Sequence, residues 1–80
     1  MPEILSSIER EVAEITKRIA GISGDLAPDQ DIYDAGLSSV ASLTLLIELE
    51  EAFTVSISDE QFVACRTVGD LSRMISELQA

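Results

Sequence analysis

The 80-residue sequence contains no histidine, no tryptophan and a single cysteine, Cys65. Without histidine, neither a Ser–His nor a Cys–His nucleophile pair can be assembled. One cysteine excludes an internal disulfide and fits a reducing compartment. Because Cys65 follows an apolar stretch, we interpret it as a buried free thiol rather than a reactive one. We therefore expect no catalytic residues and no enzymatic activity.

Basic residues are scarce, since five lysines and arginines face fifteen acidic residues, for a net charge of −10. Such a surface repels nucleic acid and anionic membranes but attracts basic patches on other proteins. The acidity is equally explained as a means of keeping a small domain soluble. Nothing approaches the roughly 18 consecutive apolar residues of a membrane span, and there is no secretory signal. We therefore expect a cytoplasmic monomer that binds neither nucleic acid nor membrane.

Aromatic residues make up only 4% of the chain, whereas apolar residues make up 46%. Because 80 residues cannot hold two cores, we predict a single domain over residues 1–80 with an aliphatic core. The first helix is indicated by apolar residues that recur every three or four positions: Leu5, Ile8, Val12, Ile15 and Ile19. It should begin near Pro2 and Glu3 and end at Gly21 and Gly24.

A long connection runs from Gly21 to about Leu37 and includes four aspartates. Connections of this length in small domains are usually functional or anchored by their own side chains. Four apolar side chains are expected to anchor this one to the core: Leu26, Ile32, Tyr33 and Leu37.

A second helix is predicted from Ser39 to Phe53, with Ser38 and Ser39 both suited to cap its N-terminus. Its apolar side is assigned to Leu43, Leu46, Ile47, Leu49, Ala52 and Phe53. We expect Leu46 and Phe53 in particular to face the core.

Two further helix starts follow. Ser58 and Gln61 have the spacing of a capping box and predict a short helix that ends before Arg66. Thr67 and Asp70 repeat this spacing ahead of a last helix, whose apolar stripe is Val68, Leu71, Ile75 and Leu78. Residues 55–57 could form a strand, but no partner strand exists. The sequence therefore predicts an all-α fold of three main helices and one short one.

The loop aspartates raise the hypothesis of a calcium site. An EF-hand loop needs oxygen ligands at positions 1, 3 and 5, glycine at 6 and glutamate at 12. Counted from Asp29, position 3 is Asp31, but Tyr33, Asp34 and Val40 occupy positions 5, 6 and 12. The pattern fails at three positions, so no metal site is predicted.

A glycine turn delivers a serine to a helix start at Gly36, Leu37, Ser38 and Ser39. Unpaired N–H groups and the positive end of the helix dipole would welcome an anion there, so Ser39 is a candidate for attachment of a phosphodiester. The alternative is that both serines are simply caps after a turn. The local sequence by itself favours this second interpretation.

Four segments together resemble the acyl and peptidyl carrier protein family: Asp31–Val40, Leu43–Phe53, Ser58–Glu60 and Thr67–Leu71. They cover nearly the whole chain in the family's order and with its gaps. The resemblance implies a four-helix bundle in which Ser39 carries 4′-phosphopantetheine derived from coenzyme A. Gly36, Leu37 and Ser38 occupy the motif positions before it. The arm would hold an acyl or aminoacyl group as a thioester.

The resemblance also implies partners. These are a phosphopantetheinyl transferase, a loading ligase or acyltransferase, and downstream transfer enzymes with basic docking surfaces. The second helix is the family's usual docking surface, which implicates Val40, Glu48, Glu50 and Glu51. The alternative from a different class is an acidic helical adaptor that binds proteins and is never modified.

Two departures bear on the pathway. Fatty-acid members of the family commonly have aspartate before the modified serine, where this chain has Ser38, and often have acids where it has Ala41 and Thr44. These differences favour a specialised carrier. Our first hypothesis is a stand-alone carrier charged with an amino acid by a dedicated ligase. The second is a polyketide or special-lipid acyl carrier.

Overall fold

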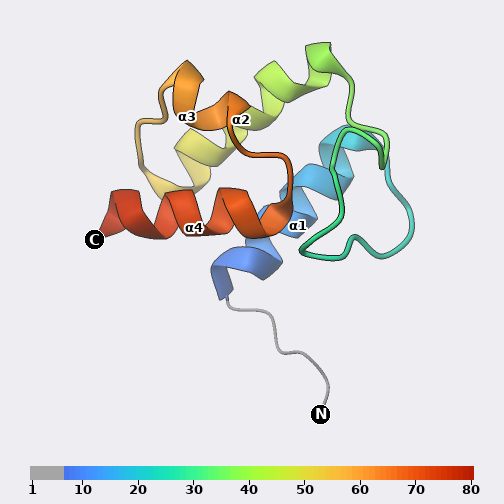
Figure 1. Ribbon diagram of the computed structural model, residues 1–80, viewed down its shortest axis with the longest axis horizontal. Helices are drawn as coiled ribbons and strands as arrows, with labels where there is room; N and C mark the ends of the chain where they lie inside the picture. Colours follow the sequence, from blue (N-terminus) through green and yellow to red (C-terminus); the bar gives the residue numbers. More distant parts are fainter. Residues whose placement is uncertain (1–6) are drawn as a thin grey trace.

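The computed structural model describes residues 7–80, which fold into four helices joined by irregular segments (Figure 1). The helices are α1 (Ser7–Ala20), α2 (Ser39–Phe53), α3 (Asp59–Val63) and α4 (Val68–Gln79). Three main helices and one short helix confirm the predicted all-α fold. The proposed helix start at Pro2 and Glu3, and the apolar Leu5, lie outside the described residues.

The core lies where α1 packs against both α2 and α4. Its buried apolar side chains are Val12, Ala13, Ile15, Leu26, Ile32, Leu37, Leu45, Leu49, Ile57, Phe62, Cys65, Val68, Leu71, Met74 and Ile75. All but one of these are aliphatic or sulfur-containing, as the low aromatic content predicted. None of the helices within residues 7–80 is long and apolar enough to span a membrane.

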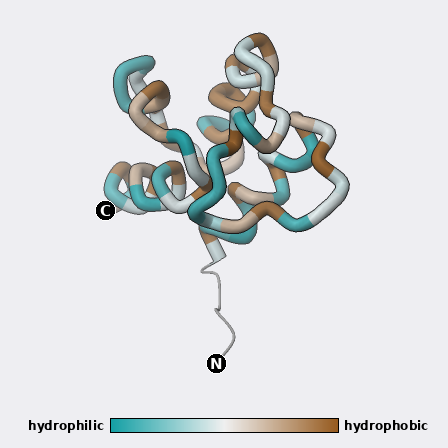
Figure 2. Tube along the Cα trace, turned by 45° about the vertical axis from the view of Figure 1, so that its right-hand side comes forward, coloured by the Kyte–Doolittle hydropathy of each residue, from teal (hydrophilic) through white to brown (hydrophobic). Residues whose placement is uncertain are grey.

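The connection between α1 and α2 belongs to the core despite its irregular backbone. Leu26, Ile32 and Leu37 are each at most 6% exposed, and Tyr33 packs against the cluster. Figure 2 shows hydrophobic residues interspersed with hydrophilic ones along this connection as well as along the helices. The predicted anchoring of the loop is therefore confirmed.

The helix ends follow the capping signals in the sequence. Gly21, with φ of +73°, follows the last residue of α1. Ser58 and Gln61 form a reciprocal capping box at α3. Thr67 caps α4 by accepting from the Asp70 amide at 3.0 Å. The side-chain caps at α3 and α4 accept hydrogen bonds from backbone N–H groups that a helix start leaves unpaired. The left-handed backbone of Gly21 turns the chain away from α1.

Residues 54–58 join α2 to α3 without forming a strand, as predicted. Thr54 has a left-handed backbone with φ of +55°, and its N–H closes the end of α2 on the Glu50 carbonyl. Over residues 7–80 the β-type pairing consists of one isolated bridge between Asp31 and Thr67.

The predicted apolar side of α2 is wrong in part. Leu43 and Ile47 are 62% and 55% exposed, while Leu45 and Leu49 are fully buried. Ala52 is also exposed, whereas Leu46 and Phe53 are half-buried and pack against the core, as expected. The reason is that apolar residues surround most of this helix, so their spacing does not single out one face. Which side faces the core is decided by the packing against α1.

Replacing Leu45 by alanine should destabilise the domain by about 2–5 kcal/mol, because a fully buried side chain is lost and a cavity remains. The matched control is Leu43→Ala, two residues away on the exposed side, which should change the free energy of unfolding by less than about 0.5 kcal/mol. Urea unfolding of both variants measures the difference. Equal losses would mean that the buried face of α2 has been assigned incorrectly.

Ser38 caps α2, since its hydroxyl oxygen accepts from the Ala41 amide at 3.0 Å. Ser38→Ala should therefore cost about 1 kcal/mol of stability through loss of this hydrogen bond. Ser39→Ala makes the same chemical change one residue later and should cost less than about 0.5 kcal/mol. Thermal or urea unfolding compares the two, and a larger loss at Ser39 would reverse the assignment of the cap.

Candidate modification site at the start of α2

Ser39 is the first residue of α2, and its side chain is exposed. The sequence left open which of the two serines caps the helix. The structure gives that role to Ser38, whose backbone is extended and whose Oγ bonds to the Ala41 amide. The Ser39 hydroxyl forms no hydrogen bond with any described residue. It is therefore accessible and chemically unengaged.

The three residues before Ser39 each have a distinct structural task. Gly36 has φ of +132°, a conformation that a residue with a Cβ rarely adopts, and its N–H donates to the Tyr33 carbonyl at 3.2 Å. Leu37 is 3% exposed and anchors the turn in the core. Ser38 then caps the helix. The turn, the anchor and the cap together hold Ser39 at the helix start.

The surroundings of Ser39 fit a phosphodiester. Over the described residues, the amides of Ser39 and Val40 have no hydrogen-bond acceptor, because they belong to the first turn of α2. The positive end of the helix dipole also lies there. The first turn carries no acidic residue, so no carboxylate on this turn opposes an anion. These features leave Ser39 as the candidate for the phosphopantetheine attachment that the resemblance implied.

The turn before the site is built around the Asp31 carboxylate. Its Oδ1 accepts from the amides of Tyr33 at 2.8 Å and Asp34 at 3.1 Å, and its Oδ2 accepts from Arg66 Nε at 2.7 Å. The Arg66 hydrogen bond and these amides lower the pKa of Asp31 below its ordinary value. The Asp31 carboxylate is therefore held in its charged form, and both of its oxygens are engaged by the turn and by Arg66.

The loop aspartates do not converge into a calcium site. Asp31 is occupied by two amides and an arginine. Nowhere in residues 7–80 do three His, Cys, Asp or Glu side chains gather in a way that could hold a metal ion.

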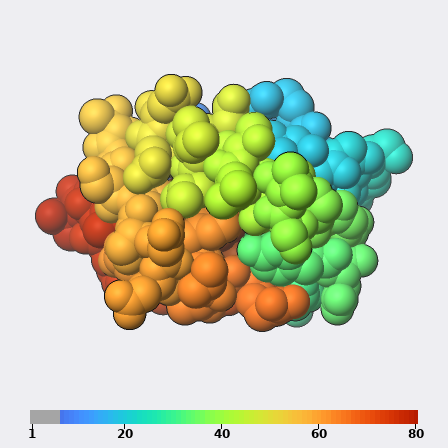
Figure 3. Space-filling model, turned by 90° about the horizontal axis from the view of Figure 1, so that it is seen from above, coloured from blue at the N-terminus to red at the C-terminus, as the bar shows by residue number. Residues whose placement is uncertain are grey.

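An exposed apolar stripe runs along α2 from the candidate site. We define the α2 stripe as Val40, Leu43 and Ile47, which are 79%, 62% and 55% exposed. Their spacing of three and four places them on one side of the helix. Figure 3 looks onto the face formed by α2 and α3, and α3 contributes a further exposed apolar residue, Val63. Sequence reasoning found only Val40, because it assigned the other two α2 residues to the core.

The three acids predicted to bind partners differ in their availability. Glu48 pairs with Arg18 of α1 at 3.2 Å. Glu50 is half-buried, and its Oε2 accepts from the Ile57 amide at 2.9 Å, so it anchors the connection to α3. Only Glu51 is both exposed and free of an ion pair or hydrogen bond with the described residues. The acidic composition suggested a docking surface dominated by charge. On α2, however, the exposed large hydrophobic residues form the α2 stripe, and one of the three acids is free.

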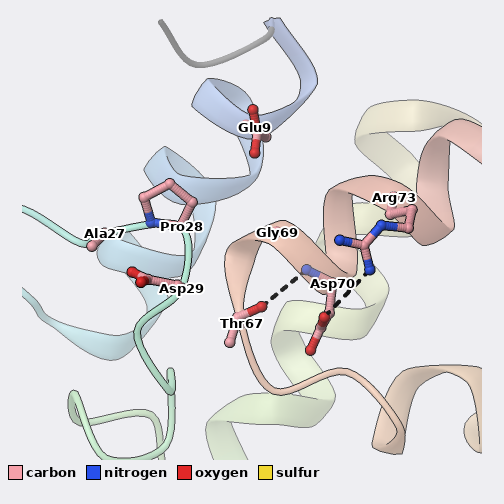
Figure 4. Close-up of a pocket in the computed structure, with 8 residues that line it drawn as sticks. All are labelled: Glu9, Ala27, Pro28, Asp29, Thr67, Gly69, Asp70 and Arg73. Carbon is pink, nitrogen blue, oxygen red and sulfur yellow. Dashed lines mark hydrogen bonds and ion pairs between the residues drawn. The ribbon is translucent and has the colours of Figure 1, made fainter. Parts of the chain in front are cut away.

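A groove of about 490 Å³ lies away from Ser39, between α1, the long connection and the start of α4 (Figure 4). Its lining residues are Glu9, Ala27, Pro28, Asp29, Thr67, Gly69, Asp70 and Arg73. A Cβ on Gly69 would lie 3.1 Å from the Pro28 carbonyl oxygen, so glycine permits the close approach of this loop to α4. The groove does not reach the candidate site, and attachment to an exposed hydroxyl requires no pocket.

Cys65 is 7% exposed, and its thiol donates to the Gln61 carbonyl at 3.3 Å. Burial raises its pKa, which disfavours the reactive thiolate. The expectation of a buried thiol is confirmed.

The sequence was compared with protein families and with known proteins, and both comparisons point to carrier proteins. Residues 10–75 match the family described as "Phosphopantetheine attachment site". The chain is 37% identical to an acyl carrier protein of Kineococcus radiotolerans over 79 residues, covering 96% of this chain and 93% of that protein.

Solved structures of other proteins have a similar fold. A domain in a docking domain complex of the Pax NRPS has 26% identity and a TM-score of 0.82, covering 99% of this chain and 78% of that chain. A type-II acyl carrier protein from Streptomyces verticillus involved in bleomycin biosynthesis has a TM-score of 0.83, covering 92% of this chain and 88% of that one. At 20% identity, it supports the fold alone.

The family match covers most of the chain, and the fold agrees with it. This chain therefore belongs to the phosphopantetheine-binding carrier protein family, and it is a non-catalytic carrier domain that bears covalently attached 4′-phosphopantetheine.

Proposed function

We propose that Ser39 is the attachment residue and that the chain delivers an acyl or aminoacyl group to partner enzymes in the cytoplasm. When attached, the arm supplies a terminal thiol that holds this group as a thioester. The protein's own residues expose and orient the attachment point. The observation that carries the proposal is that Ser38 caps α2 and leaves the Ser39 hydroxyl free.

The two serines differ in a way that supports this choice. The Ser38 Oγ accepts the Ala41 amide, so attachment of a bulky phosphodiester to Ser38 would disturb the cap. A group on Ser39 would leave that hydrogen bond in place. The exposure of Ser39 also supports access by a modifying enzyme. The nature of the carried group is set by the loading enzyme rather than by the carrier.

Partner docking on the α2 stripe is the second part of the proposal. Apolar side chains that are exposed together near a functional residue commonly mark an interaction surface. Glu51 is the acid left free on this helix, whereas Glu48 and Glu50 have structural contacts. The surface therefore fits partners that offer an apolar patch bordered by a basic residue. The phosphopantetheinyl transferase is the first such partner.

Incubation with coenzyme A and a broad-specificity phosphopantetheinyl transferase should add the mass of one phosphopantetheine to the wild-type protein. Ser39→Ala should abolish the addition, because the attacking hydroxyl is gone. Ser38→Ala is the matched control and should still be modified. Intact-mass spectrometry measures all three proteins.

Retention of the added mass in Ser39→Ala together with its loss in Ser38→Ala would move the site to Ser38. An unchanged mass of the wild type with several transferases would contradict attachment at Ser39 and at Ser38 alike. The mass of the protein isolated from its native host would further identify the group it carries.

A Leu43→Ala/Ile47→Ala double variant should raise the KM of the transferase for this protein about tenfold, because it removes two neighbouring apolar contacts near the centre of the proposed interface, where the costly truncations cluster. The rise should persist at high salt. Glu51→Gln should have a smaller effect that fades as salt increases, because exposed charges are screened.

Val63→Ala tests whether the interaction surface extends onto α3. Both α2 side chains are exposed, so the double variant should fold normally, which thermal unfolding verifies. An unchanged KM in the folded double variant would exclude the α2 stripe as the docking surface for this enzyme.

A further inference from the structure

We infer that Arg66 is a positioning residue for the modification of Ser39, because it fixes the turn that leads to this serine from the connection between α3 and α4. The inference rests on the proposed attachment at Ser39. Arg66 lies 27 positions later in the sequence. Its guanidinium group contacts Asp31 and the ring of Tyr33, and its backbone carbonyl contacts Ile32.

The guanidinium group of Arg66 holds the carboxylate of Asp31. Nε donates to Oδ2 at 2.7 Å, and Nη2 donates to Oδ1 at 3.4 Å. The same guanidinium lies over the Tyr33 ring, 4.8 Å from its centroid. A planar fork that pairs with a carboxylate while it stacks on a ring is a geometry that lysine cannot reproduce.

The backbone of Arg66 adds two contacts. Its carbonyl accepts from the Ile32 amide at 2.8 Å, and its N–H donates to Asp70 Oδ2 at 3.2 Å. Asp70 lies in the first turn of α4. One residue therefore ties the turn before α2 to the beginning of α4.

Hydrogen bonds to Asp31 and Ile32 order the turn before the candidate site as far as Leu37. The Asp31 side chain accepts the amides of Tyr33 and Asp34, and its carbonyl accepts the Ala35 amide at 3.0 Å. The next carbonyl, that of Ile32, accepts the Leu37 amide at 3.0 Å.

After Leu37, the chain reaches the cap Ser38 and then Ser39. Packing against α1 sets which side of α2 faces the core, and the order of this loop fixes how the chain enters the first turn of the helix. The order of the loop depends on the Asp31 carboxylate and on Arg66, which holds this carboxylate in place.

The Arg66–Asp31 pair is expected to matter for the order of the turn but little for the overall stability of the domain. Its side chain is 57% exposed and that of Asp31 is 26% exposed, and an ion pair of this kind contributes little to overall stability. Neither Arg66 nor Asp31 belongs to the buried core cluster. Loss of the pair should therefore loosen the turn while the helices stay packed.

The test uses the full chain, coenzyme A and a broad-specificity phosphopantetheinyl transferase. Arg66→Gln should lower kcat for modification about tenfold, because small misplacements of a reacting group cost rate. The KM should stay within about twofold, because the α2 stripe that docks the enzyme is intact. Arg66→Lys keeps the charge but not the fork, and should fall between glutamine and wild type. Arg10→Gln, which removes an exposed arginine of α1, is the matched control for charge and should leave kcat unchanged.

A second measurement does not depend on the enzyme. The amide chemical shifts of Asp34, Ser38 and Ser39 should change in Arg66→Gln and remain in place in Arg10→Gln. Circular dichroism and thermal unfolding verify that the variants are folded at the assay temperature. If Arg66→Gln were unfolded there, Arg66→Lys would carry the test.

Two results would overturn the inference: an unchanged kcat in a folded Arg66 variant, or an equal fall in kcat in Arg10→Gln, which would mean a general effect of charge. Absence of modification in the wild type would instead contradict the proposed function. In that case the amide shifts of Ser38 and Ser39 would still show whether Arg66 orders their surroundings.

Discussion

The carboxylate of Asp31 organises the irregular segment on which the candidate site depends. A long loop must satisfy its backbone N–H groups without the regular ladder of a helix or sheet. Asp31 does so by accepting two amides of the following turn, and Arg66 holds the carboxylate from another part of the chain. Buried Ile32 and Leu37 fasten the same segment to the core. The turn that precedes Ser39 is thus fixed from both sides.

The two adjacent serines have different roles in the proposed site: Ser38 caps α2, and Ser39 keeps a free hydroxyl. A helix start needs a side-chain acceptor, and attachment needs a hydroxyl that is free and exposed. With Ser38 as the cap, Ser39 is not required for the fold and can be altered without loss of the helix start. The aspartate that is common at this position in fatty-acid carriers has the same capping chemistry, so serine here preserves the cap while removing one negative charge beside the site.

Local signals predicted the end of α1, the bounds of α2 and the starts of α3 and α4, because the relevant physics lies within a few residues. The capping box at Ser58 and Gln61, the cap at Thr67 and the glycine at the end of α1 all occur where the sequence placed them. The facing of α2 could not be predicted in this way. With apolar residues on most sides of the helix, the choice between Leu43 and Leu45 is made by packing against α1. The role of Arg66 was also hidden, since its partner Asp31 lies 35 residues away in the sequence.

The acidic composition and the apolar stripe serve different stages of the proposed docking. Three of the five basic residues, Arg18, Arg66 and Arg73, form ion pairs with acids of the same chain. The surplus negative charge is therefore spread over the surface, where it attracts basic partners over long range and raises the encounter rate. Close contact at α2 is different, because Glu48 and Glu50 are engaged and the exposed stripe is apolar. Charge would bring the partner near, and the desolvation of Val40, Leu43 and Ile47 would hold it beside Ser39.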